Sequence, residues 1–119
     1  MYDEREIYAP LVLFEYDHNP GNYCLMLSDS HMVDVIDVFE ERGHEGGGYD
    51  WEAVARQIVR AEAPGLAQRV DFDPEAGMFV AFGSDLEALQ LLGRHMHEAF
   101  HNRDLLVQWV EGADPDWFD

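Results

Sequence analysis

The sequence predicts an α+β domain of order ββααββα, in which helices cover one face of a four-stranded antiparallel sheet. Two patterns indicate this fold. Residues 11–28 and 70–82 each contain two apolar runs around a turn rich in proline and glycine, and such pairs favour hairpins. Between and after these pairs, apolar residues recur at helical spacing. The chain has 119 residues, of which 47% are hydrophobic, so we expect one domain, 1–119, with a single core.

The two hairpins are predicted from their turns. His18-Asn19-Pro20-Gly21 and Pro74-Glu75-Ala76-Gly77 both contain the residues that favour a tight turn. The four strands expected around them are residues 11–17, 22–28, 70–73 and 78–82. Each hairpin is followed by a Ser-Asp pair, at Ser28 and at Ser84, that can begin a helix. The two halves of the chain therefore repeat one order of elements.

The first helix is predicted from the caps Ser28-Asp29-Ser30 to Arg42, where a glycine follows. Its apolar stripe consists of Met32, Val35, Ile36 and Phe39. At about 100° per residue, Asp34, Asp37 and Glu41 fall on the opposite side of the same helix. We therefore expect an outward row of carboxylates over an inward apolar stripe.

Two further helices and a short final one complete the predicted fold. The second helix extends from Asp50 to about Glu62 and places Trp51 in the core. The third begins at the capping box Ser84-Asp85-Leu86-Glu87, in which a hydroxyl and a carboxylate each bind a free backbone amide. Its buried stripe is Leu86, Leu89, Leu92, Gly93, Met96 and Phe100. A short helix is expected beyond Asn102, and the aromatic pair near the end of the chain is expected to fold back onto the core.

The charge of the chain restricts its partners. The sequence has 25 Asp and Glu residues against 7 basic residues, all of them Arg, for a formal net charge of -18. Such a surface repels nucleic acid and anionic lipid and attracts a basic protein. The acidic N-terminus argues against export, and the lack of a long apolar stretch argues against insertion into a membrane. The single Cys24 is expected to be a free thiol in the core, which fits the cytoplasm.

One motif offers an enzymatic alternative. His97-Glu98-Ala99-Phe100-His101 fits the H-E-x-x-H pattern, in which two histidines one helical turn apart bind zinc and a glutamate activates water. Phe100 belongs to the buried stripe, so both histidines lie on its flank and Glu98 points away from its centre. We therefore expect no enzyme, no resident cofactor and no catalytic residues. A small zinc hydrolase is kept as the alternative, together with incidental metal binding by His95, His97 and His101.

Glycines at 43 and 46–48 suggest a flexible connection between the first two helices. A phosphate-binding loop also needs glycines, but here no lysine follows, and Glu45, Asp50 and Glu52 would repel a phosphate. A hinge or wide turn is the simpler interpretation of this segment.

The segment around these glycines resembles the immunity protein 51 family of bacterial polymorphic toxin systems. The resemblance lies in Gly46-Gly47-Gly48-Tyr49-Asp50-Trp51 and the preceding Phe39-Glu40-Glu41-Arg42-Gly43, and it continues through Asp73-Pro74-Glu75-Ala76-Gly77-Met78-Phe79 to the end that contains Trp. Where the core of the family has Asn, this chain has Gly47. The resemblance implies a small cytoplasmic antitoxin that binds and blocks a toxin delivered by a neighbouring cell, without catalysis or cofactor.

The charge and the resemblance together predict an immunity protein that neutralises a basic toxin, for which a nuclease is one candidate. Carboxylates of this chain would occupy the sites where the toxin would hold phosphates, and an aromatic residue would be the central anchor. The expected partner-binding residues are Asp34, Asp37, Glu41, Glu45 and Tyr49. An acidic adaptor or regulatory domain unrelated to toxins is the other alternative.

Overall fold

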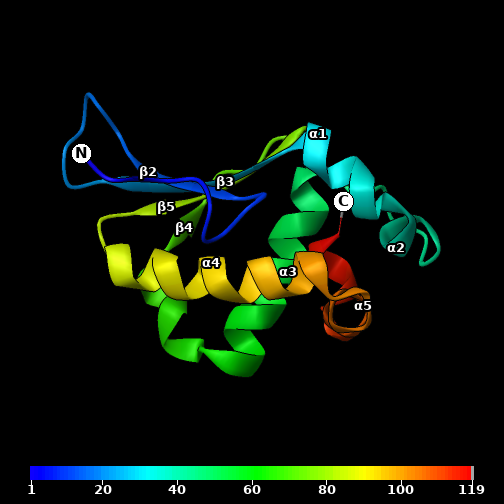
Figure 1. Cartoon of the computed structure of the whole chain (residues 1–119). Helices are drawn as coiled ribbons and strands as arrows, with labels where there is room; N and C mark the ends of the chain where they lie inside the picture. Colours follow the sequence, from blue (N-terminus) through cyan, green and yellow to red (C-terminus); the bar gives the residue numbers. More distant parts are fainter. Residues whose placement is uncertain (119) are drawn as a thin grey trace.

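A five-stranded antiparallel sheet is one layer of the computed structural model, which describes residues 1–118 (Figure 1). The strands are β1 (Asp3–Glu4), β2 (Val12–Glu15), β3 (Tyr23–Ser28), β4 (Asp71–Phe72) and β5 (Met78–Gly83), in the order β1-β2-β3-β5-β4. Both predicted hairpins form, and their inner strands β3 and β5 pair at the centre of the sheet. The edge strand β1 was not predicted, because a two-residue strand has no periodicity of its own.

Helices form the second layer. They are α1 (Asp29–Met32), α2 (Ile36–Glu40), α3 (Gly48–Glu62), α4 (Leu86–His101) and α5 (Arg103–Gly112), with 3-10 turns η1 (Val33–Val35), η2 (Pro64–Gln68) and η3 (Pro115–Trp117). Figure 1 shows α3, α4 and α5 on one side of the sheet, with α1 and α2 beyond one end of it. The predicted α+β class, with an antiparallel sheet and helices on one face, is confirmed, with one strand more than expected.

The core lies between the sheet and these helices. Side chains alternate across each strand, and every second one points at the helices. Leu13, Leu25, Leu27, Phe79 and Ala81 take these positions and are fully buried. The predicted core residue Trp51 is also fully buried, with its ring centre 5.4 Å from that of Phe39.

The predicted first helix is wrong in one respect: it is not continuous. The chain forms α1, then the 3-10 turn η1, then α2, and Val35 leaves helical geometry with φ -127° and ψ 15°. Three of the four residues at 33–36 are β-branched, which lowers helix propensity. The interruption turns the buried side, so that Val38 is fully buried whereas Val35 and Ile36 are only half-buried.

Helix starts also differ from the prediction. The Ser84 capping box does not form. Asp85 is the N-cap of α4, and its carboxylate accepts a hydrogen bond of 3.1 Å from the Ala88 amide. Asp85 is also paired with Arg69 at 2.6 Å, so the same side chain caps α4 and forms an ion pair. Asn102 caps α5 through the Leu105 amide, and the predicted final helix is confirmed.

The aromatic residues near the C-terminus fold back, but only Phe118 packs against the core as predicted, whereas Trp117 lies against Arg60. Phe118 stacks on His44, with the ring centres 3.8 Å apart, and the Arg60 guanidinium lies 4.6 Å from the ring centre of Trp117. The chain end thus contacts the segment after α2 and the outer side of α3. Among residues 1–118, no helix combines the length and the apolar character needed to cross a bilayer.

Candidate protein-binding surface

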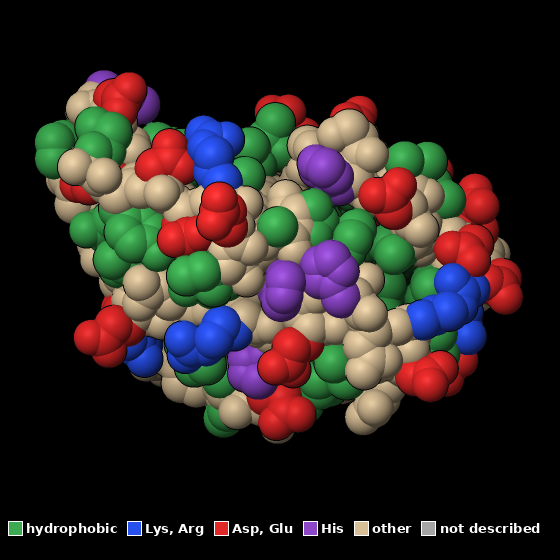
Figure 2. All heavy atoms as spheres, in the orientation of Figure 1, with side chains coloured by type: hydrophobic (Ala, Val, Ile, Leu, Met, Phe, Trp, Pro, Cys, Tyr) green, Lys and Arg blue, Asp and Glu red, His purple; other side chains and the backbone are tan. Residues whose placement is uncertain are grey.

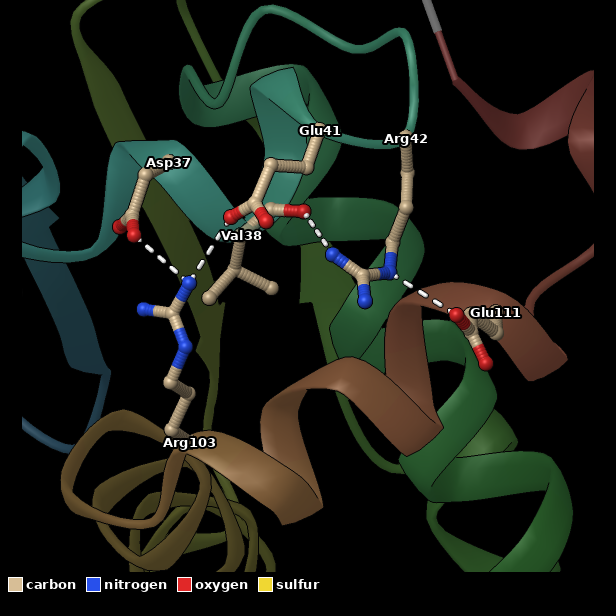
Figure 3. A network of polar contacts seen from close by, with 6 residues as sticks. All are labelled: Asp37, Val38, Glu41, Arg42, Arg103 and Glu111. Atoms are coloured by element: carbon tan, nitrogen blue, oxygen red, sulfur yellow. Dashed lines mark hydrogen bonds and ion pairs between the residues drawn. The ribbon is translucent and has the colours of Figure 1, made fainter.

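Two of the predicted partner-binding residues, Asp37 on α2 and Glu41 directly after its last residue, share one cation. Arg103, the first residue of α5, pairs with Asp37 at 2.6 Å and with Glu41 at 2.9 Å (Figure 3). The hydrogen bond from Arg103 lowers the pKa of Asp37, and the same bond raises the pKa of Arg103. All three side chains are about half exposed. The carboxylates are therefore accessible to a partner but already partly neutralised.

A second arginine joins the same two helices. Arg42 donates a hydrogen bond of 2.9 Å to the Val38 carbonyl and pairs with Glu111 of α5 at 3.0 Å (Figure 3). The end of α2 is thus held against α5 by two cations that lie 61 positions apart in the sequence. Periodicity along α2 could not reveal them.

Most of the positive charge of the chain is used internally in this way. Within the described residues, five of the seven arginines form ion pairs with acids of the same chain; these are Arg5, Arg42, Arg56, Arg69 and Arg103. In residues 1–118 no such pair involves Asp34 or Glu45, two exposed members of the predicted set. The electric field toward solvent therefore comes mainly from carboxylates.

The glycine segment is a packed joint rather than the flexible hinge that was predicted. Gly48 donates its amide to the Ala76 carbonyl at 3.0 Å, so the start of α3 is joined to the turn of the second hairpin. A Cβ on Gly48 would lie 1.9 Å from the Glu75 carbonyl oxygen, and one on Gly47 would lie 2.5 Å from that of Ala76. Gly46 has φ +83°, which favours glycine. Glycine is needed at positions 47 and 48 because the backbone of the second hairpin leaves no room for a Cβ there.

Asp50 closes this joint from inside. It is only 1% exposed, and its Oδ2 accepts a hydrogen bond of 2.6 Å from the Gly46 amide. Its Oδ1 has no hydrogen-bond partner among residues 1–118. The sequence predicted Asp50 as the cap that starts the helix, whereas α3 begins at Gly48 and Asp50 lies in its first turn. Hydrophobic periodicity gives no sign of a buried acid that accepts a hydrogen bond from the amide of an earlier glycine.

Tyr49 and Glu45 both lie beside this buried acid. Together with Asp50 they line a cavity of about 20 Å³, and Tyr49 remains 39% exposed. Glu45 also borders a neighbouring hollow of about 370 Å³ between α1 and the turn of the second hairpin. The predicted residues therefore form two groups, Asp37 with Glu41 and Glu45 with Tyr49. Asp34 is exposed on η1 and borders neither hollow.

The histidine motif on α4 has a structural role. Nδ1 of His97 lies 2.7 Å and Nε2 of His101 2.8 Å from the same oxygen, the Ala9 carbonyl. A carbonyl only accepts, so both rings donate to it and tie the segment before β2 to α4. Glu98 is exposed. In the described part of the chain, no three His, Cys, Asp or Glu side chains gather in a way that could hold a metal ion, so His95 does not complete a metal site there.

Figure 2 shows this side of the molecule, where histidines gather among scattered acidic and basic side chains, without a large field of one sign.

The comparison with protein families settles the resemblance seen in the sequence. The model of immunity protein 51 matches residues 11–115. The chain belongs to this family. The match includes both hairpins, the glycine joint and helices α3 to α5. No curated protein and no solved structure matches the chain. Membership in the immunity protein 51 family makes this chain an immunity protein and implies a role in binding rather than catalysis.

Proposed function

We propose that this immunity protein binds and neutralises a basic toxin domain, for which a nuclease is one candidate, through its acidic surface. The observation that carries the proposal is the charge of -18, in a chain whose few arginines are mostly paired internally. A partner with a positive active-site cleft would be steered to this surface over long distances. Family membership supports the class of partner.

The proposed contact residues are Asp34, Asp37, Glu41, Glu45 and Tyr49. A basic side chain of the toxin would compete with Arg103 for Asp37 and Glu41, since both carboxylates are exposed beside it. Asp34 and Glu45 would meet the toxin without such competition. Tyr49 supports this role because it is a large exposed aromatic next to an acid, as in interface anchors.

The remaining features of the proposal follow from the same class of protein. We propose that residues 1–119 act as one immunity-type domain in the cytoplasm of the cell that makes it, without enzyme activity or cofactor. One core cluster with residues from both hairpins and from α3, α4 and α5 supports the single domain. The toxin is the expected partner; nucleic acid and membranes are not, because the same negative charge repels both.

Association kinetics test the proposal. The probe is the toxin domain encoded by the adjacent reading frame, in a catalytically inactive form. The double variant Asp37→Asn/Glu41→Gln removes two negative charges and leaves Arg103 unpaired, so we expect association to slow by about tenfold at low salt with little change in dissociation. Raising the salt concentration to physiological strength should slow the unaltered protein as well.

A matched control removes two charges elsewhere. Glu62→Gln/Glu98→Gln alters exposed acids at the end of α3 and on α4 and gives the same net charge. It should slow association much less than the α2 double variant. Equal rates for the two double variants would refute the assignment to α2, and an association rate that does not depend on salt would refute the electrostatic mechanism.

A further inference from the structure

The face of the sheet that points away from the helices is apolar. Strand register places Phe14, Cys24 and Phe82 side by side across three strands. A second row next to it consists of Val12, Met26 and Val80. These residues alternate with the core-facing leucines, so they point to the opposite side. We call this set of six residues the open sheet face.

The helices leave this face uncovered. Helices α3, α4 and α5 lie on the other side of the sheet (Figure 1). Cys24 is buried beneath its neighbours, but the other five residues of the open sheet face are only half-buried. Apolar side chains that no helix covers leave this face available to a partner.

A hollow opens on the same face near the N-terminus. Its volume is about 440 Å³, and Phe14, Tyr16 and Met26 contribute to its lining. The rings of Phe14 and Tyr16 meet edge to face with their centres 5.7 Å apart, and His18 lies 5.7 Å beyond Tyr16. The open sheet face therefore has both a flat apolar area and a concave aromatic end that could receive a protruding side chain.

Carboxylates surround the apolar rows. Asp3 pairs with Phe14 at one edge of the sheet, and Asp71 pairs with Phe82 at the other. The Asp73 amide donates to the Val80 carbonyl at 3.0 Å, which places a third acid at the end of the second row. Asp17 borders the hollow. All four acids are exposed, and the one arginine that lines the hollow, Arg5, is already paired with Asp3 at 2.9 Å.

An apolar centre with a charged rim is the usual composition of a protein interface. We propose that the open sheet face is a docking surface for the basic toxin domain, whose apolar residues would cover the two rows while its Lys and Arg side chains meet the acidic rim. This inference rests on the proposed function and adds a second contact area to it. A second copy of the chain is disfavoured as the occupant, because it would bring two like-charged rims together.

Methionine methyl NMR tests the inference without any mutation. Met26 belongs to the open sheet face, whereas Met96 is fully buried on α4 beneath the other side of the sheet. When the inactive toxin domain encoded by the adjacent reading frame is added to protein labelled at methionine methyl groups, we expect the Met26 signal to shift or broaden. The Met96 signal should stay in place and serves as the internal reference.

Substitutions give the energetic test. Phe14→Thr/Phe82→Thr keeps residues that favour strands but removes both rings of the first row, and it should weaken toxin binding at least tenfold. The control, Ile7→Thr, changes an apolar residue that is 59% exposed and belongs to neither proposed contact area, and it should change affinity less than twofold. Thermal unfolding of each variant checks that it is folded. If the Phe14→Thr/Phe82→Thr variant is unfolded, the Met26 signal of the unaltered protein decides the question.

The outcomes separate this inference from the proposed function. If the toxin domain binds and the α2 variants weaken binding, but Met26 does not respond and the strand variant binds normally, the open sheet face is not used and the inference is wrong while the proposed function stands. If Met26 responds to the concentration of the immunity protein alone, the occupant is a second copy, which also overturns it. Absence of any binding to the unaltered protein would overturn both.

Discussion

The contact between the glycine joint and the second hairpin predicts a large effect for Gly48→Ala. A Cβ at this position would lie 1.9 Å from the Glu75 carbonyl oxygen and 2.3 Å from that of Met78, so one backbone must move. Overpacking of this kind costs about 1–3 kcal/mol. The movement also breaks the 3.0 Å hydrogen bond from Gly48 to Ala76, which contributes about 1 kcal/mol. The better helix propensity of Ala offsets up to about 1 kcal/mol.

We therefore expect Gly48→Ala to lower the free energy of unfolding by about 1–4 kcal/mol, which lowers the melting temperature of a domain of this size by roughly 4–15 °C. Thermal unfolding followed by circular dichroism at 222 nm measures this directly. Gly65→Ala is the matched control, since nothing lies within 4 Å of its Cβ position. Reduced freedom of the unfolded chain should make that variant neutral or more stable by about 0.5 kcal/mol. A Gly48→Ala melting temperature within 2 °C of the unaltered protein, on the order of 0.5 kcal/mol, would refute the packed joint.

Two further predictions concern titration and metal. Burial raises the pKa of Tyr16 to about 12, so its contribution to stability is fully present below the ordinary tyrosine pKa near 10 and is lost as pH rises through 12. Tyr16→Phe should therefore reduce the loss of unfolding free energy between pH 10 and 12, measured by urea unfolding at each pH. The chain has no lysine that would titrate in this range. An unchanged pH profile would contradict the prediction. EDTA and Zn²⁺ should each leave the melting temperature unchanged, because His97 and His101 already bind the Ala9 carbonyl, and a clear rise with equimolar Zn²⁺ would revive the zinc-site alternative.

The elements that the sequence predicted well are those with a strong local pattern. The Pro-Gly turns at 18–21 and 74–77 define both hairpins, and the long apolar stripes define α3 and α4. The errors lie where tertiary contacts override a local preference. The helix α4 is capped by Asp85 rather than by Ser84, and Asp85 also pairs with Arg69, which lies 16 positions earlier in the chain.

Part of the candidate site was also predictable from local spacing along the sequence. Asp37 and Glu41 are four positions apart on the helix that the sequence predicts, and the structure places them together at the end of α2. Asp34 does not join them, because the interruption at Val35 separates η1 from α2. No periodic pattern could show that Arg103 neutralises this pair from another helix.

The sequence by itself determined the charge of the molecule, its two hairpins and its family. These properties depend on composition and on residues close together in the chain, so they can be recognised before folding. Only the tertiary structure decided which carboxylates Arg103 masks, which backbone the glycines at 46–48 touch, and which face of the sheet the helices leave open. These depend on contacts between segments tens of residues apart, and such contacts form only when the core packs.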